Sequence, residues 1–321
     1  HGCADYPSST SLPRRDAALS IIAVLGPTAA GKSDLAELIA ERLEAEILSV
    51  DSMQVFTGMD IGTAKPDLVA RRRFRYRMID VADPSEEYTV AEYQAAGTTI
   101  LDDAAASGRD VVIAGGSGLH FRSLVDPLDF PPTDPDLRAE LEMTSGRELR
   151  DELIAADPEA ADVVDLANPR RVLRAVEILR LTDATPSARA ASAEAEAVRS
   201  YRPIRPFKAV GIDPGPILGE RIERRFDAML AAGFVAEVAG LAPRLGRTAR
   251  QAVGYRELLP VVDGGGDLAT ARGEAIRATA SLAKRQRTYF RRDPRIRWIP
   301  WHHDRSEMLG AALEARAKDV T

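Results

Sequence analysis

Short apolar runs recur along the first part of the chain, and segments with helical patterns alternate with them. Residues 19–25, 46–50 and 110–114 are such runs, and continuous apolar character is typical of parallel strands that are buried on both faces. Residues 34–43 and 89–106 repeat apolar residues at helical spacing. This alternation predicts an α/β protein in which helices flank a parallel sheet on both faces.

The pattern changes in the middle of the chain. Residues 126–135 form a Pro-rich connector, and the chain beyond them to about residue 197 is rich in Ala, Glu and Arg without a strand-like run. We therefore expect an inserted all-helical domain at residues 123–205. Pro135 and Pro169 stand where a helix can begin, because proline suits the first helical turn.

After this insertion the chain is expected to return to the sheet. Residues 207–212 have the apolar character of a strand, whereas residues 217–241 and 269–291 have helical patterns, the second being the last long helix expected. Residues 1–17 lack an apolar core and are expected to be a flexible tail. The core is then expected to consist of residues 18–122 and 206–321.

Composition narrows the class of protein. The 321 residues are 45% hydrophobic and 29% charged, with a single cysteine. No apolar run approaches the ~20 residues that a membrane span needs, and one cysteine cannot form an internal disulfide. We expect a cytoplasmic protein with no membrane contact that acts as a monomer, although the sequence itself leaves oligomeric state open. The net charge of −6 does not exclude a nucleic-acid ligand, because local clusters of basic residues set the field near a ligand.

Residues 26–33 read Gly-Pro-Thr-Ala-Ala-Gly-Lys-Ser and match the complete phosphate-binding loop pattern between a predicted strand and helix. Main-chain N–H groups and the helix dipole attract phosphate, and Lys32 adds a full charge. Ser33 is positioned to bind Mg²⁺. The motif predicts a P-loop NTPase-like core that holds a phosphate-bearing ligand through Gly26, Pro27, Thr28, Ala29, Ala30, Gly31, Lys32 and Ser33.

Two polar residues follow other predicted strands. Asp51 comes directly after residues 46–50, at the carboxyl end where parallel sheets bind ligands, and it is either a general base or a helix cap. Ser117 lies in a Gly-rich turn after residues 110–114 and either reaches the same crevice or serves tight turn geometry. No Asp or Glu ends that strand, which disfavours ordinary ATPase or GTPase chemistry.

Basic residues form several candidate contacts. Arg221 and Arg225 are four apart and suit a phosphate clamp, but pairing with Glu220 or Asp227 on a solvated surface is the favoured interpretation of the pattern alone. Residues 284–292 interleave basic and aromatic residues, and Trp298 and Trp301 follow. Such a segment suits unpaired RNA, or it is a solvated helix with an aromatic stripe facing the core. Arg170, Arg171 and Arg174 are a second candidate contact with an RNA backbone.

Five blocks in this order resemble the tRNA dimethylallyltransferases, the bacterial tRNA isopentenyl transferase family. They are residues 26–33, residues 51–66 with Gly-Met-Asp-Ile-Gly-Thr-Ala-Lys-Pro at their end, Gly-Gly-Ser-Gly-Leu at 115–119, Asn-Pro-Arg-Arg-Val-Leu-Arg-Ala at 168–175, and Ala-Val-Gly-Tyr-Arg-Glu at 252–257 with residues 283–291. The resemblance covers nearly everything after residue 18.

The resemblance implies transfer of a dimethylallyl group from its diphosphate to the exocyclic amine of the adenosine on the 3′ side of the anticodon. It implies that Asp51 takes the amine proton, that the loop and Mg²⁺ stabilise the leaving diphosphate, and that the adenine flips out of its stack. The catalytic residues so expected are Asp51, Ser117, Lys32 and Arg221. Contacts with the tRNA anticodon stem-loop are expected from Asp51, Ser52, Met53, Gln54, Ser117, Arg138, Arg170, Arg171, Arg174, Lys284, Arg285 and Gln286.

Three positions depart from the family pattern. Ser117 stands where Thr is usual, and Phe56 and His120 stand where Tyr is usual; a serine keeps the hydroxyl, so we expect activity to be retained. Two other hypotheses remain open. One is a small-molecule kinase with ATP in the loop, and the other is a non-catalytic RNA-binding protein that uses a nucleotide as a switch.

Overall fold

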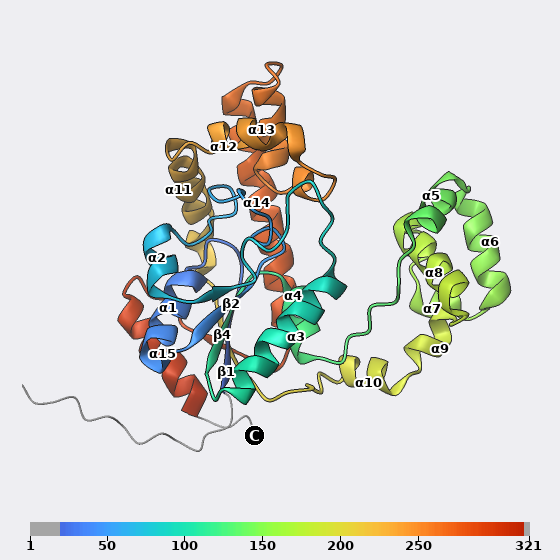
Figure 1. The fold of residues 1–321 in the computed structure, drawn as a ribbon, viewed down its shortest axis with the longest axis horizontal. Coiled ribbons are helices and arrows are strands. Elements are labelled where there is room, and N and C mark those ends of the chain that lie inside the picture. Colours follow the sequence, from blue (N-terminus) through green and yellow to red (C-terminus); the bar gives the residue numbers. More distant parts are fainter. Residues whose placement is uncertain (1–19, 318–321) are drawn as a thin grey trace, which may run out of the picture.

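The computed structural model describes residues 20–317, so the tail expected at residues 1–17 lies outside the described residues. Within the described part, six strands form one all-parallel sheet in the order β3-β2-β4-β1-β5-β6 (Figure 1). The strands are β1 (Ile21–Leu25), β2 (Glu46–Val50), β3 (Tyr76–Arg77), β4 (Val111–Gly115), β5 (Lys208–Ile212) and β6 (Ile296–Ile299). The predicted α/β fold is confirmed, and the four strands expected from the sequence are β1, β2, β4 and β5.

Helices surround this sheet, and a second group of helices stands to one side of it (Figure 1). The helices of the core are α1 (Lys32–Leu43), α2 (Leu68–Arg73), α3 (Val90–Ala106), α4 (Gly118–Val125), α11 (Leu218–Ala231), α12 (Phe234–Leu241), α13 (Tyr255–Val262), α14 (Leu268–Arg291) and α15 (Arg305–Ala317). The second group and its link are α5 (Pro135–Met143), α6 (Gly146–Ala156), α7 (Ala160–Val163), α8 (Pro169–Thr182), α9 (Pro186–Ala190) and α10 (Ala193–Arg199).

The sheet is buried on both faces because its side chains alternate between two hydrophobic clusters. In β1, one cluster receives Ile21, Ala23 and Leu25, and the other receives Ile22 and Val24. The first cluster also contains side chains of α3, α4 and α14, whereas the second contains side chains of α1 and α15. The carboxyl ends of the strands remain open toward the loops that follow them, which is where a doubly wound sheet binds ligands.

The segments expected to be helical in the C-terminal half are helical, with two differences in detail. Residues 217–241 form two helices, because Gly233 between them adopts φ 101°, a left-handed conformation that glycine tolerates. The helix expected at residues 269–291 is α14, but it is not the last element, since β6 and α15 follow it. In β6 the buried Ile296 and Ile299 flank an exposed Arg297, so the strand lacks the continuous apolar run that identifies β1.

The second group of helices has a small core of its own. Asp134 caps α5 by accepting a hydrogen bond from Leu137 N at 2.8 Å, and Asn168 caps α8, so helices begin at the two predicted prolines. The buried residues of this core are Leu141, Leu149, Leu153, Ala160, Val172, Ala175 and Val176. The group joins the rest of the chain through two connecting segments (Figure 1).

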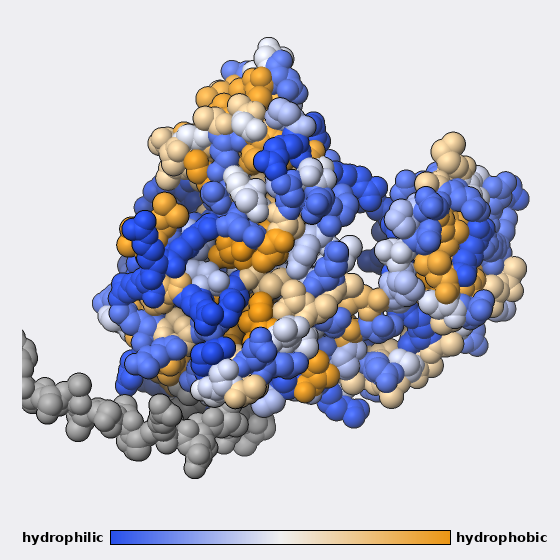
Figure 2. Space-filling model, viewed as in Figure 1, coloured by the Kyte–Doolittle hydropathy of each residue, from blue (hydrophilic) through white to orange (hydrophobic). Residues whose placement is uncertain are grey.

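No single helix within residues 20–317 is both long enough and apolar enough to cross a membrane. The helices at Gly215–Ala231 and Phe234–Arg244, bent by 66° relative to each other, together have the length and apolar composition of a membrane span. The face of the molecule in Figure 2 is mostly hydrophilic, with hydrophobic residues in separate groups.

Candidate active site at the phosphate loop

Residues 26–33 connect β1 to α1, as expected, and their carbonyl groups are held by surrounding donors. The pairs are Lys32 Nζ with Pro27 O (2.7 Å), Arg221 Nε with Ala29 O (2.7 Å) and Trp301 Nε1 with Ala30 O (3.0 Å). Gly26 has no room for a side chain, because a Cβ there would lie 2.3 Å from Ile212 O. Thr28 N and Ala30 N already donate to Gln286 Oε1 and Pro27 O, so an anion would bind the N–H groups at the start of α1.

Three cationic side chains surround this loop. Burial and the nearby Arg225 together lower the pKa of Lys32 to about 7, while the charge of Asp51 opposes the shift. Burial also lowers the pKa of Arg221 and of Arg225, and Arg225 Nη1 donates to Thr28 Oγ1 at 3.2 Å. The shifts arise mainly from burial, which disfavours the charged form, so an anion bound beside these cations would stabilise them.

The interpretation of Arg221 and Arg225 as solvated surface residues is therefore wrong. Neither residue has a carboxylate within ion-pair distance in the part of the chain that the structure describes, although the charge of Asp51 reaches Arg225. The acids expected to pair with them bind other arginines, Glu220 with Arg224 and Asp227 with Arg272. Both arginines instead face the loop.

A cavity of about 870 Å³ opens in front of the loop. Ser33, at the start of α1, is exposed and lines it. Ser52, expected as an RNA contact, does not line it. The predicted site residues that do are Thr28, Ala29, Gly31, Lys32, Ser33, Asp51, Gln54, Arg221 and Gln286, and Arg225 joins them.

Asp51 satisfies both interpretations that the sequence left open. Its Oδ1 accepts hydrogen bonds from Met53 N at 2.9 Å and Gln54 N at 3.4 Å, which closes the turn after β2. No described residue hydrogen-bonds to its Oδ2, and the side chain lines the cavity that holds Lys32. One oxygen is thus structural, and the other is available to a substrate.

Ser117 directly precedes α4, and its hydroxyl lies against His120 and does not line the large cavity. Ser117 Oγ lies 2.6 Å from His120 Nδ1, and the His120 ring packs edge-on against Tyr93 with ring centres 4.5 Å apart. Burial lowers the pKa of His120 to about 4, against the opposing charge of Asp51. His120 is therefore neutral near pH 7, and it orients the Ser117 hydroxyl.

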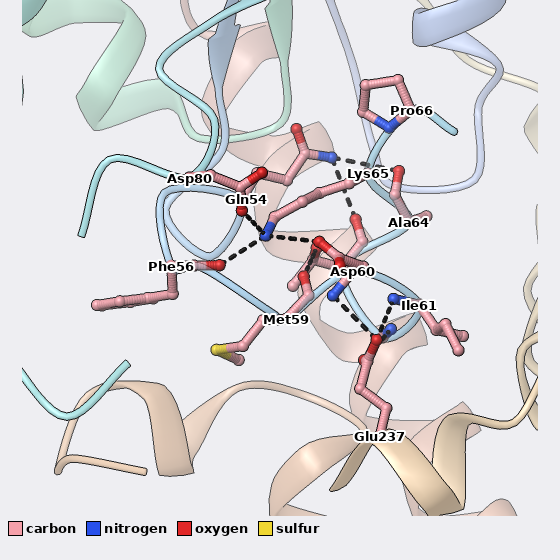
Figure 3. Close-up of polar contacts among 12 residues, drawn as sticks. Gln54, Phe56, Met59, Asp60, Ile61, Ala64, Lys65, Pro66, Asp80 and Glu237 are labelled. Carbon is pink, nitrogen blue, oxygen red and sulfur yellow. Dashed lines mark hydrogen bonds and ion pairs between the residues drawn. The ribbon is translucent and has the colours of Figure 1, made fainter. Parts of the chain in front are cut away.

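The block at residues 58–66 folds into a compact loop beside Asp51. Lys65, whose side chain is 1% exposed, donates to Phe56 O at 2.6 Å, to Asp60 Oδ1 at 3.0 Å and to Asp80 Oδ1 at 2.5 Å (Figure 3). Gln54 Nε2 donates to two carbonyls of the loop, Thr63 O at 3.2 Å and Ala64 O at 3.3 Å.

Gln54 is thus committed to the loop in this structure. Its Oε1 also accepts a hydrogen bond from Ser49 Oγ at 2.8 Å, so both N–H groups and the carbonyl of the amide already have partners. Its role in reading a flipped base stays a prediction, and it requires the amide to exchange these internal hydrogen bonds for a base.

Glu237 of α12 holds the same loop from the opposite side, and sequence reasoning missed it. Its carboxylate accepts hydrogen bonds from the main-chain N–H groups of Asp60, Ile61 and Gly62 at 3.0, 2.7 and 3.0 Å (Figure 3). Tyr255 Oη donates to the same carboxylate. The blocks at residues 58–66 and 252–257 therefore meet at one acid, which no local pattern around Glu237 reveals.

A smaller cavity of about 90 Å³ adjoins the large one. The two share Thr28, Ala29, Asp51, Thr63, Arg225 and Met229 as lining residues. The lining found only in the smaller cavity is mainly apolar and includes Met53, Ile222, Phe226, Phe234, Ala252, Val253 and Leu282. An apolar chamber thus opens beside the charged loop.

The arginines expected to contact RNA in the second group of helices differ in their surroundings. Arg138 and Arg174 each place Nη1 2.7 Å from Oε2 of the fully buried Glu177. Arg170 and Arg171 are exposed at the start of α8. These four arginines and Arg189 line a hollow of about 630 Å³.

The C-terminal basic segment is only partly available to RNA. Lys284 and Arg285 are exposed, and Gln286 Oε1 accepts a hydrogen bond from Thr28 N at 2.8 Å. Trp298 packs against the core, whereas Trp301 donates to the phosphate loop and lies under the Arg221 guanidinium. These contacts favour the core-facing interpretation for both tryptophans.

Comparison with known proteins places the chain among tRNA-modifying enzymes. A family model described as IPP transferase matches residues 54–293. The tRNA dimethylallyltransferase of Streptomyces griseus is 41% identical over 310 residues, which are 94% of this chain and 97% of that protein. The full-length tRNA isopentenylpyrophosphate transferase of Bacillus halodurans is 31% identical with a TM-score of 0.65 and covers 93% of this chain and 98% of that chain. A third similar structure is that of a eukaryotic dimethylallyltransferase acting on tRNA. It is 22% identical with a TM-score of 0.75, and the match covers 93% of this chain and 77% of that chain. At this identity the likeness shows the fold alone.

Proposed function

The chain belongs to the IPP transferase family of tRNA dimethylallyltransferases, and from this premise we propose how its residues perform the transfer. The acceptor is the exocyclic amine of the adenosine on the 3′ side of the anticodon, the donor is dimethylallyl diphosphate, and the product is isopentenyladenosine. Lys32, Asp51 and Arg221 line one cavity within this chain, which is compatible with the monomer that we propose. Because tRNA is the acceptor, we expect the protein to act in the cytoplasm.

One observation supports these roles above the others. The cavity before the phosphate loop brings Lys32, Arg221 and Arg225 together with Asp51. The cations have lowered pKa values and no ion-pair partner among the described residues, so a diphosphate would supply the missing negative charge. Asp51 is then the acid that can accept a proton beside the departing anion.

The reaction balances on these groups. The bond between C1 of the dimethylallyl group and the diphosphate oxygen breaks, and the electron pair leaves with the diphosphate. The bond between the amine nitrogen and C1 forms, and the amine proton passes to Asp51. Lys32, Arg221 and the loop N–H groups stabilise the charge that develops on the leaving oxygen. The adenine must leave its stack to reach this cavity, as other base-modifying enzymes require.

Ser33 is the residue that would hold Mg²⁺. No group of three or more His, Cys, Asp or Glu side chains that could hold a metal gathers within residues 20–317. A single protein ligand, the Ser33 hydroxyl, fits Mg²⁺, which binds through few protein oxygens together with water and substrate phosphates. When bound, the ion would offset negative charge on the diphosphate.

The second group of helices supports binding of the anticodon stem-loop. Arg170 and Arg171 are exposed on the rim of an arginine-lined hollow, and each can neutralise a backbone phosphate. Lys284 and Arg285 are exposed on α14 and offer two further positive charges to the RNA. Ser117 stays a candidate for the acceptor site, through a hydroxyl that His120 orients.

Incubation with radiolabelled dimethylallyl diphosphate tests this proposal. The label should enter an unmodified tRNA transcript and should not enter free AMP. Label in AMP would indicate a cytokinin-type synthase instead. ATP turnover without RNA would favour a small-molecule kinase, and RNA binding without any transfer would favour a non-catalytic protein.

A further inference from the structure

Phe234 is one of the apolar residues that line the smaller cavity beside the phosphate loop. It lines this cavity and not the larger one, whereas Thr28 and Asp51 line both. The side chain is completely buried at the start of α12. Its ring meets Phe226 and Tyr255 edge-on, with ring centres 6.0 and 5.0 Å apart.

Two glycines make room for this ring. A Cβ at Gly62 would lie 2.3 Å from Phe234 Cε2 and 2.4 Å from Tyr255 Cε2, and a Cβ at Gly254 would lie 2.9 Å from Phe234 Cε1. Gly62 belongs to the block at residues 58–66, and Gly254 belongs to the block at residues 252–257. Both blocks therefore pack directly against the phenyl ring of Phe234. They also contact each other through Glu237.

The volume of the cavity limits what it can hold. A cavity of about 150 Å³ holds a benzene ring, so 90 Å³ is on the scale of one five-carbon isoprene unit and leaves no space for a second. The lining beyond Asp51 and Arg225 is mainly apolar, as a hydrocarbon chain requires. Phe234 bounds the part of this cavity that the larger cavity does not share.

We propose that Phe234 sets the length of the prenyl donor by closing the apolar chamber after one isoprene unit. This inference rests on the proposed function, since it assigns the chamber to the hydrocarbon end of the donor. A smaller residue at this position opens space that the neighbouring Gly62 and Gly254 have no side chains to fill. The variant should then accept geranyl diphosphate, whose second isoprene unit occupies the vacated space.

The chemistry of the transfer stays the same with the longer donor. The C1–O bond of geranyl diphosphate breaks, the diphosphate leaves with the electron pair, and the amine nitrogen bonds to C1 as its proton passes to Asp51. Phe234 touches only the hydrocarbon end, so it determines specificity and takes no part in proton transfer. The ratio of kcat/KM for geranyl to that for dimethylallyl diphosphate therefore isolates its role.

We would measure this ratio with an unmodified tRNA transcript for the unchanged chain and for Phe234→Ala and Phe234→Leu. We expect the ratio to rise by at least about tenfold in Phe234→Ala, since one or two methylene groups in an apolar pocket already discriminate by that factor. A smaller rise is expected in Phe234→Leu, which keeps most of the core packing and covers the case in which the alanine variant does not fold.

Phe121→Leu is the matched control. Phe121 is also completely buried and also meets an aromatic ring edge-on, Phe207 at 5.4 Å, but it lines neither cavity. Its ratio should equal that of the unchanged chain even if its thermal stability falls. An unchanged ratio in folded Phe234→Leu, or an equal rise in Phe121→Leu, would overturn the inference. Failure of the unchanged chain to transfer a dimethylallyl group would instead overturn the proposed function and the inference with it.

Discussion

Arginines at the same spacing have opposite surroundings in the phosphate-loop site and in the second group of helices. Arg221 and Arg225 are four residues apart, and so are Arg170 and Arg174. At the loop, no described carboxylate lies within ion-pair distance of either arginine, and burial lowers the pKa of both. In the helices, Arg174 pairs with the buried Glu177 and also donates to Pro131 O at 2.6 Å.

The difference distinguishes arginines that stabilise the fold through internal ion pairs from arginines that are available to bind an anionic ligand. An arginine beside a buried acid completes an internal ion pair, and removing either partner leaves an uncompensated charge. Buried arginines without such an acid are stabilised when an anion enters. Spacing along a helix predicts which residues share a face, but it does not show where the acids lie.

The largest effect should come from Asp51, the acid proposed to accept the proton beside the cations of the site. Asp51→Asn keeps an oxygen that can accept the hydrogen bond from Met53 N, but it removes the base. We expect kcat to fall by at least about 100-fold, with tRNA affinity nearly unchanged. Single-turnover transfer and filter binding measure the two quantities. A loss of tRNA binding together with kcat would mean that Asp51 has only a structural role.

Removing one unpaired cation should weaken donor binding specifically. We expect Arg225→Gln to raise the Kd of dimethylallyl diphosphate by about 10- to 100-fold, the usual value of a hydrogen bond to a charged group. Arg180→Gln is the matched control, because Arg180 already pairs with Glu140 and Glu152 in the second group of helices. Calorimetric titration should show no change in the donor Kd of Arg180→Gln. An equal loss of donor affinity in both variants would contradict the distinction between paired and unpaired arginines.

The exposed arginines of the helices should serve RNA, not the donor. We expect Arg170→Gln with Arg171→Gln to weaken tRNA binding by about tenfold and to reduce the salt dependence of binding by about two phosphate contacts. The KM of the donor should stay the same. Arg174→Gln should mainly lower Tm, since it removes a partner of Glu177. An unchanged salt dependence in the double variant would contradict a backbone contact.

The smallest effect concerns the pH dependence of stability. The pKa of Lys32 falls from 10.5 to about 7 on folding, so the unfolded chain binds more protons between these values. The contribution of Lys32 to stability therefore rises as pH increases from about 7 toward 10.5. Lys32→Met should raise Tm most at pH 6, and the gain should shrink by pH 9. A gain that grows with pH would contradict the sign of this shift.

The parts of the site that depend on local pattern could be predicted from the sequence. The phosphate loop between β1 and α1 and the placement of Asp51 after β2 follow from short apolar runs and the residues that end them. Arg221 and Arg225 could not be assigned in this way, because their role depends on the absence of nearby acids, which is a property of the tertiary structure.

Other features were missed because their partners are distant or their patterns are weak. Glu237 reaches the main chain of Ile61 across 176 positions, and nothing near it in the sequence marks that contact. β6 has two buried isoleucines in four residues, too few to distinguish it from a loop. Trp301 looked available to RNA, but its N–H supports Ala30 O.

The central claim is that the loop at residues 26–33 and Asp51 act on two sides of one reaction. A crystal structure with an anticodon stem-loop and the unreactive donor analogue dimethylallyl S-thiolodiphosphate tests it most directly. We expect the diphosphate against the loop N–H groups and Lys32, with the exocyclic amine of the adenine facing Asp51 Oδ2. An adenine bound away from Asp51, or a diphosphate bound away from the loop, would contradict the account.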